Sequence, residues 1–267
     1  MRILSSASSE RFRLAALLLS MFAVSSCGGR PPDSRARVVT WNYYVAMGDS
    51  ITAATGDDFP GDDTSLDGKT TGGGFEPILN NRLTAFTGHP QTVVDAGVGG
   101  TTSADGVALI PTLLQQNPGA QIYLVMYGMN DARPSKPVPS GLGLNPGDPG
   151  YAGSYKDHMQ QIVDAINNSG GQVALAKIPI ALGDCNDPAI CPPYPDPNTG
   201  ARSLNIQQYN KVIDELVAAP ANHIAITPPD FYSYFEAHYQ TEYSDNIHPN
   251  GIGYQSMASL WFQALTK

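Results

Sequence analysis

Short apolar segments alternate with amphipathic segments along most of this chain, and this alternation restricts the possible fold more than any other feature. The apolar segments are rich in Val, Ile, Leu and Tyr, which is typical of strands buried on both faces. We predict strands at 43–48, 92–96, 121–127, 172–178 and 223–227. We predict helices at about 75–87, 102–116, 154–168, 203–219 and 251–265. Strand–helix alternation favours right-handed crossovers and therefore an α/β fold, a three-layer α/β/α sandwich around a parallel sheet of about five strands.

The chain contains neither an internal repeat nor a second composition regime, and we predict one domain over residues 41–267. Three long loops interrupt the alternation, at 52–74, 131–153 and 179–202. Each loop follows the C-terminal end of a predicted strand, which is the edge where ligands bind in open parallel sheets. We expect these loops to determine which substrate is accepted, because long loops in compact domains are usually functional.

Residues 1–26 are predicted to be a signal peptide. Three arginines precede an apolar stretch at 14–24, which is followed by small residues. This order of basic, apolar and small residues is typical of a secretory signal. The apolar stretch is shorter than the roughly 20 residues that span a bilayer, so we do not expect a transmembrane helix here.

The segment Val24-Ser25-Ser26-Cys27 resembles a bacterial lipobox, in which the cysteine becomes the lipidated N-terminus of the mature chain. The resemblance implies lipidation of Cys27, a tether over residues 27–40, and a membrane-anchored lipoprotein that faces the periplasm or the cell exterior. The alternative is an ordinary cleaved signal peptide and a secreted protein.

Two further cysteines, Cys185 and Cys191, lie six residues apart in a Pro-rich loop. In an exported protein such a pair predicts a disulfide, and two free thiols are the alternative. No histidine accompanies them in this loop, so a zinc site is not expected there.

The formal net charge of the chain is −9, and it becomes more negative if the arginine-rich leader is removed. This acidity disfavours binding to nucleic acid and offers no basic patch for anionic lipid headgroups. We therefore expect any association with a membrane to depend on the N-terminal anchor alone.

A serine and a histidine–aspartate pair have the chemical character of a nucleophilic triad. Ser50 follows the first predicted strand, whereas Asp245 and His248 lie three residues apart near the end of the chain. A serine hydroxyl is a weak nucleophile unless a positioned base takes its proton, and an aspartate orients that base. Each group also has an ordinary explanation: Ser50 as a cap after a strand, and Asp245 as a turn residue before the last helix. His238 is an alternative base.

Four short motifs occur in order, and together they resemble the SGNH hydrolase superfamily, also known as GDSL lipases and esterases. The motifs are Gly48-Asp49-Ser50, Gly97-Val98-Gly99-Gly100-Thr101-Thr102, Gly128-Met129-Asn130-Asp131 and Asp245-Asn246-Ile247-His248-Pro249. The resemblance covers about 40–265 and implies a flavodoxin-like fold. It also implies an oxyanion hole formed by the Ser50 and Gly100 N–H groups and the Asn130 side chain. The alternative is that the glycines and Asn130 only form turns.

The sequence thus predicts an exported serine hydrolase that cleaves carboxylic esters through Ser50, His248 and Asp245, without a cofactor or a metal. Lipids, acetylated glycans and small aryl or alkyl esters are all suitable substrates. Two other functions remain open: a non-catalytic lipoprotein that binds a glycan or a lipid on the same scaffold, and a metal-dependent phosphoesterase.

Overall fold

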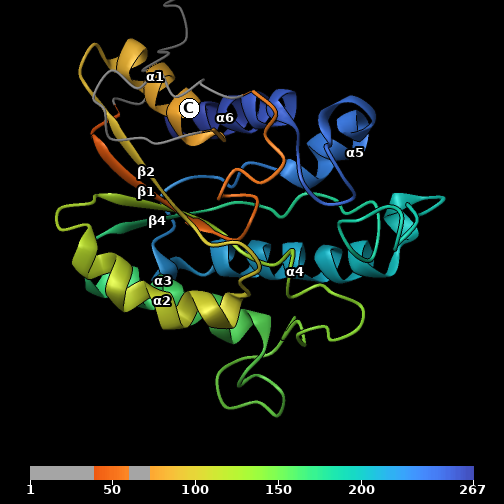
Figure 1. Ribbon diagram of the computed structural model, residues 1–267. Coiled ribbons are helices and arrows are strands. Elements are labelled where there is room, and N and C mark those ends of the chain that lie inside the picture. The colour runs from red at the N-terminus through yellow and green to blue at the C-terminus, as the bar shows by residue number, and fades with distance from the viewer. Residues whose placement is uncertain (1–38, 60–72) are drawn as a thin grey trace, which may run out of the picture. The chain divides into compact units, whose positions relative to one another are not determined.

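The computed structural model describes residues 39–59 and 73–267 (Figure 1). The predicted signal peptide, Cys27 and most of the tether lie outside the described residues, as does the part of the first long loop at 60–72. Within the described ranges, no helix is both long enough and apolar enough to cross a membrane.

A four-stranded parallel sheet forms the centre of the fold and confirms the predicted α/β class. Its strands are β1 (Tyr43–Gly48), β2 (Thr92–Gly97), β3 (Ile122–Met126) and β4 (Gln172–Leu175). They are arranged in the order β2-β1-β3-β4, and every neighbouring pair is parallel. This is the strand order of a flavodoxin-like sheet, as the resemblance implied.

Helices cover both faces of the sheet and complete the three predicted layers (Figure 1). One face carries α1 (Glu76–Thr87), α5 (Phe231–Glu242) and α6 (Gly251–Thr266), and the other carries α2 (Ser103–Gln116), α3 (Tyr155–Asn168) and α4 (Ala201–Ala218). Two short 3-10 helices, η1 (Pro197–Thr199) and η2 (Pro220–Asn222), flank α4.

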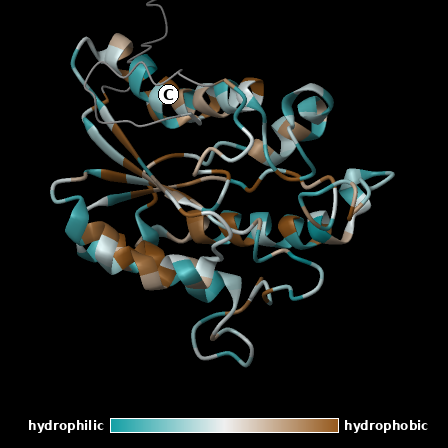
Figure 2. Ribbon diagram, in the orientation of Figure 1, coloured by the Kyte–Doolittle hydropathy of each residue, from teal (hydrophilic) through white to brown (hydrophobic). Residues whose placement is uncertain are grey.

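Burial on both faces of the sheet explains why the strands are nearly continuous apolar runs. In β1 the side chains of Tyr44, Val45, Ala46 and Met47 are all fully buried, although successive residues point to opposite faces. Apolar residues follow the strands and the helix sides that contact them (Figure 2). The apolar character of β1 therefore reflects its central position between β2 and β3.

The fifth predicted strand, 223–227, does not form a regular strand in the structure. The segment is extended beside β4, where the Ala225 N–H donates to the Val173 carbonyl at 2.7 Å, but only an isolated bridge joins Ile224 to Val173. Pro228 and Pro229 follow at once, and proline has no N–H to continue the ladder. The sheet therefore has four regular strands.

Helix α5 was not predicted from the sequence. Its start is defined by Asp230, whose side chain accepts a hydrogen bond from the Ser233 N–H at 3.0 Å. Its fully buried residues include Phe231 and Phe235, while other aromatic residues of the helix lie towards the surface. Aromatic residues have modest helix propensity, and their distribution here hides the helical period.

The sheet order brings the C-terminal ends of β1, β2 and β3 together. Gly48, the last residue of β1, pairs with Gly97 of β2 on one side and with Met126 of β3 on the other. The segments that follow these residues therefore emerge at one edge of the sheet. Here the connections that leave β1 and β2 run to opposite faces of the sheet, β1 towards α1 and β2 towards α2. This is the position where open α/β sheets bind ligands.

Close packing beneath this edge requires glycine at position 97. A Cβ atom on Gly97 would lie 2.3 Å from the Ala53 nitrogen, which is too close for any heavy-atom contact. We expect Gly97→Ala to lower the free energy of unfolding by about 1–3 kcal/mol, because the backbone must shift to make room. Urea denaturation measures this change.

Gly99→Ala is the matched control, since a Cβ atom there would be 4.0 Å from the nearest atom, the Ser50 Cβ. Equal midpoints for the two variants would contradict this account of the packing.

Candidate active site

Ser50 lies in the turn that leaves the central strand β1. The turn is helical in character: the Ala53 N–H donates to the Asp49 carbonyl at 3.0 Å, and the Thr55 N–H donates to the Ser50 carbonyl at 2.9 Å. The Asp49 side chain accepts a hydrogen bond from the Ile51 N–H at 3.0 Å, as expected for an aspartate that organises the turn. Burial raises the pKa of Asp49 to about 6, in spite of this hydrogen bond.

Asp245 holds the ring of His248 in place from the turn before α6. Its Oδ2 lies 2.7 Å from His248 Nδ1, and its Oδ1 accepts the backbone N–H groups of Ile247 and His248, each at 2.8 Å. Burial acts to raise the pKa of Asp245, but the hydrogen bonds from the His248 ring and from these backbone groups outweigh it, so the pKa is lowered. The aspartate is therefore ionised at neutral pH and accepts hydrogen bonds only.

The structure brings Ser50, His248 and Asp245 into one chain of hydrogen bonds. His248 Nε2 lies 2.9 Å from Ser50 Oγ, across 198 positions of sequence. Because ionised Asp245 can only accept, the ring proton belongs on Nδ1, and Nε2 is left to accept the Ser50 hydroxyl proton. His248 is only 5% exposed, and Ser50 is 8% exposed. His238, the alternative base, is instead exposed on α5, where it stacks on Tyr234.

Two of the three predicted oxyanion donors, Gly100 and Asn130, follow the strands that flank β1. Gly100, after β2, has a φ of 83°, a backbone conformation that favours glycine. Asn130, after β3, is buried, and its Nδ2 donates to the Thr101 carbonyl at 2.9 Å. This bond uses one of the two amide hydrogens, so a second remains for a ligand. It also joins the segments that follow β2 and β3.

Two residues that were not predicted hold these segments in place. Arg133 Nη2 donates to Asn130 Oδ1 at 2.7 Å, which fixes the orientation of the amide so that its NH2 group faces the opposite way. Asp131 accepts the Ser103 backbone N–H and hydroxyl and thereby joins the β3 loop to the start of α2. Arg133 lies three residues after Asn130, but this spacing alone does not predict the hydrogen bond between their side chains.

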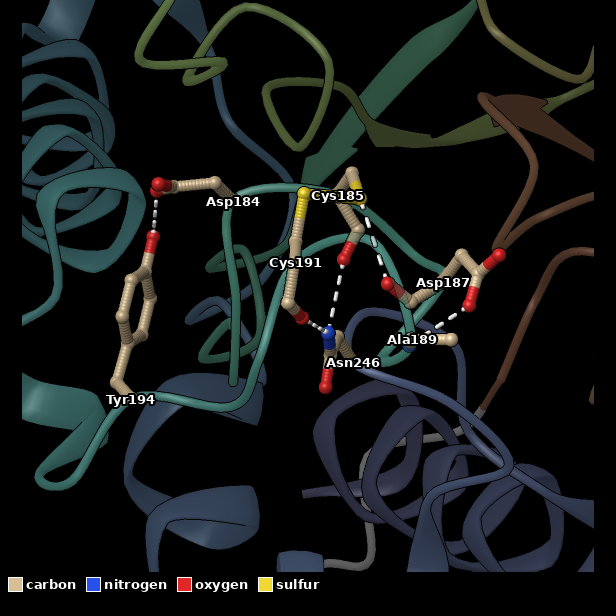
Figure 3. The surroundings of a disulfide bond; sticks show 7 residues. All are labelled: Asp184, Cys185, Asp187, Ala189, Cys191, Tyr194 and Asn246. Carbon is tan, nitrogen blue, oxygen red and sulfur yellow. Dashed lines mark hydrogen bonds between the residues drawn. A yellow bond between two sulfur atoms is a disulfide. The ribbon is translucent and has the colours of Figure 1, made fainter.

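The predicted disulfide between Cys185 and Cys191 is present in the loop at 179–202 (Figure 3). Asn246, between the two predicted triad residues, points its amide at this loop and donates to the carbonyls of Cys185 at 3.1 Å and Cys191 at 2.7 Å. The Leu182 N–H returns a bond to the Asn246 carbonyl at 2.7 Å. The loop and the turn that carries His248 are thus one hydrogen-bonded unit.

Comparison with known proteins identifies the family. Residues 46–256 match the model of the GDSL-like Lipase/Acylhydrolase family. The chain belongs to this family. The matched range includes every residue assigned to the predicted triad and oxyanion hole, and membership confirms the prediction of a GDSL-type esterase or lipase.

Individual relatives of this GDSL-like hydrolase share only a modest part of its sequence. It is 33% identical over 94 residues to Esterase TesA of Pseudomonas aeruginosa, a match that spans 35% of this chain and 40% of that protein. The acetylxylan esterase Axe2 of Geobacillus stearothermophilus has a similar fold, with a TM-score of 0.59 at 17% identity over 85% of this chain and 94% of that one. A lipase/acylhydrolase of Enterococcus faecalis has a TM-score of 0.54 at 20% identity over 83% and 94%.

The Asn246 contacts generate a prediction for stability. We expect Asn246→Ala to lower the free energy of unfolding by about 1–3 kcal/mol, because two loop carbonyls lose their donor. Urea denaturation measures the change. Asn186→Ala is the control, since the Asn186 side chain is exposed in the same loop. If both substitutions cost the same, the Asn246 bonds do not hold the loop.

Proposed function

We propose that this GDSL-like hydrolase cleaves carboxylic esters through a serine nucleophile and an acyl-enzyme intermediate. The observation that supports this most directly is the succession of hydrogen bonds from Ser50 to His248 to Asp245, with distances of 2.9 and 2.7 Å. A binding protein has no need for a buried imidazole oriented by an ionised aspartate against a serine hydroxyl. The same arrangement activates serine in unrelated hydrolases.

In the first half of the proposed reaction, Ser50 Oγ attacks the ester carbonyl and passes its proton to His248 Nε2. The ionised Asp245 stabilises the resulting imidazolium. Negative charge develops on the carbonyl oxygen, where the N–H groups of Ser50 and Gly100 and the Nδ2 group of Asn130 donate to it. The intermediate then collapses, the C–O bond breaks, and His248 returns the proton to the departing alcohol.

The second half repeats these steps with water. His248 accepts a proton from a water molecule, which attacks the acyl group on Ser50. The same three donors receive the second oxyanion. Collapse of this intermediate releases the carboxylic acid, and the proton on His248 returns to Ser50 Oγ. All proton transfers therefore use one imidazole nitrogen, and no cofactor takes part.

We propose small aryl or alkyl esters, lipids and acetylated glycans as the substrate classes. The family description supports acyl hydrolysis in general. The structural relatives include an acetylxylan esterase and a lipase/acylhydrolase, which supports acetylated glycans and lipids among these classes.

Ser50→Ala tests the nucleophile. We expect turnover of 4-nitrophenyl butyrate to fall by about 10⁶, as for loss of a catalytic serine in other hydrolases, while the fold is retained. Ser259→Ala, on α6, is a matched control. A fluorophosphonate probe should label the wild type and the control but not Ser50→Ala. A wild-type protein that the probe leaves unmodified would instead support the binding function.

We further propose that the chain is exported and anchored through Cys27. The basic and apolar leader and the lipobox-like segment support this proposal, as does the Cys185–Cys191 disulfide, since such bonds persist in oxidising compartments. On expression in a bacterium that processes lipoproteins, we expect a membrane-bound protein whose N-terminal peptide starts at a diacylated Cys27 by mass spectrometry. Cys27→Ala should release the protein from the membrane. An unmodified N-terminus in the wild type would contradict the anchor.

A further inference from the structure

A polar cavity of about 340 Å³ adjoins the proposed catalytic residues. The residues that line it include Arg133 and Arg202, together with Asp184, Cys185 and Ile247. This volume is large enough for a small organic group rather than a single ion, because one water molecule occupies about 30 Å³ in the liquid. We propose that Arg133 and Arg202 bind a carboxylate of the substrate in this cavity. The proposal extends the ester hydrolysis proposed above and rests on it for the reaction.

The cavity is connected to the reaction centre at two points. Arg133 contributes to its lining and at the same time donates to Asn130 Oδ1 at 2.7 Å, next to the amide assigned to the oxyanion hole. Ile247 also lines the cavity, and it immediately precedes His248 in the sequence. A substrate whose carbonyl lies at Ser50 is therefore close to the cavity through both the oxyanion donor and the base.

Two guanidinium nitrogens of Arg202 have no hydrogen-bond partner among the described residues. Arg202 is only 1% exposed, and its Nε and Nη1 atoms are buried without a hydrogen-bond acceptor. Burial and the nearby charge of Arg133 lower the pKa of Arg202 to about 10, so the guanidinium is still charged at neutral pH. A buried guanidinium with two unpaired nitrogens is costly, and a carboxylate in the cavity that Arg202 lines would supply the opposite charge.

Two carboxylates, Asp49 and Asp184, stabilise the charge of Arg202 from nearby but make their hydrogen bonds to other groups. Asp49 accepts the Ile51 N–H, and Asp184 accepts the hydroxyl of Tyr194. That same Tyr194 hydroxyl accepts the backbone N–H of Arg202 at 3.1 Å, which holds the start of α4 against the cavity. The arginine pair therefore retains donors for a further anion.

A carboxylate fits this pair better than other anions do. Arginine presents its N–H groups in a planar fork that matches the two oxygens of a carboxylate. Asp184 and Asp49 already balance part of the local positive charge, so a monoanion is accommodated more readily than a phosphate dianion.

Matched pairs of esters test the proposal. In one pair the charge is on the acyl side, with mono-4-nitrophenyl succinate compared with its methyl ester. In the other pair it is on the alcohol side, with 4-acetoxybenzoate compared with methyl 4-acetoxybenzoate. We expect the wild type to prefer the anionic member of one pair in kcat/KM by roughly tenfold to a hundredfold, the usual range for hydrogen bonds to a charged group.

Arg202→Gln should reduce this preference to near unity. Arg82→Gln, which removes an exposed arginine on α1 that donates to Ser259, is the matched control and should leave the preference unchanged. For each enzyme we compare kcat/KM for the anionic ester with kcat/KM for the neutral ester. This ratio does not depend on the fraction of active enzyme, and a general loss of turnover affects both esters equally. If Arg202→Gln does not fold by circular dichroism, Arg133→Gln provides the second variant. A wild-type ratio at or below one in both pairs would overturn the proposal, as would an unchanged ratio in the variant.

Binding measured without turnover separates this proposal from the proposed function. Titration calorimetry of Ser50→Ala with 4-acetamidobenzoate, succinate monomethyl ester and their neutral methyl esters measures the anion preference directly. If no ester is hydrolysed by the wild type but a carboxylate binds in preference, the cavity assignment stands and the esterase proposal fails. Loss of that preference when Arg202→Gln is added to Ser50→Ala supports the assignment. Inorganic phosphate or sulfate that binds as tightly as the carboxylates would overturn it.

Discussion

The pairing of β1 with β2 and β3 is the constraint on which the rest of this structure depends. Residues that follow three different strands converge only because Gly48 is in register with both Gly97 and Met126. The absence of a side chain at Gly97, the last residue of β2, then allows the helical turn that carries Ser50 to pack directly against this strand. The final turn before α6 completes the arrangement, since His248 reaches back across the sheet edge to a residue 198 positions earlier.

Much of this arrangement could be predicted from the sequence, because its determinants are local. Strands buried on both faces must be apolar, and the motifs at Ser50, Gly100 and Asn130 occur where such runs end. The failures involve determinants that are not local. Ile224 is apolar and extended, yet the two prolines that follow limit it to an isolated bridge. Helix α5 depends on burial of two phenylalanines, of which Phe231 packs against Trp261 of α6 and Phe235 against Tyr243 at the end of the same helix.

The side chains that support the site were also beyond prediction. Asn246 lies inside a motif that was recognised, but its partners are two carbonyls more than 50 positions away, and a carbonyl leaves no signature in a sequence. Arg202 is an arginine in a helix, which is ordinarily exposed, and only the packing of α4 shows that it is buried. By contrast, Asp245 and His248 lie within one turn, so their contact follows from their spacing alone.

The bonding between Asn246 and the disulfide loop has a consequence for how this scaffold can change. The loop forms a wall of the arginine-lined cavity, whereas the turn at Asp245 and His248 carries the proposed proton-transfer groups. The proposed binding cavity and the proposed proton-transfer groups are therefore joined by the same hydrogen bonds. A loop transplanted from a homologue will need carbonyls positioned for the same amide. A replacement that lacks them leaves Asn246, next to Asp245 and His248, without its two acceptors.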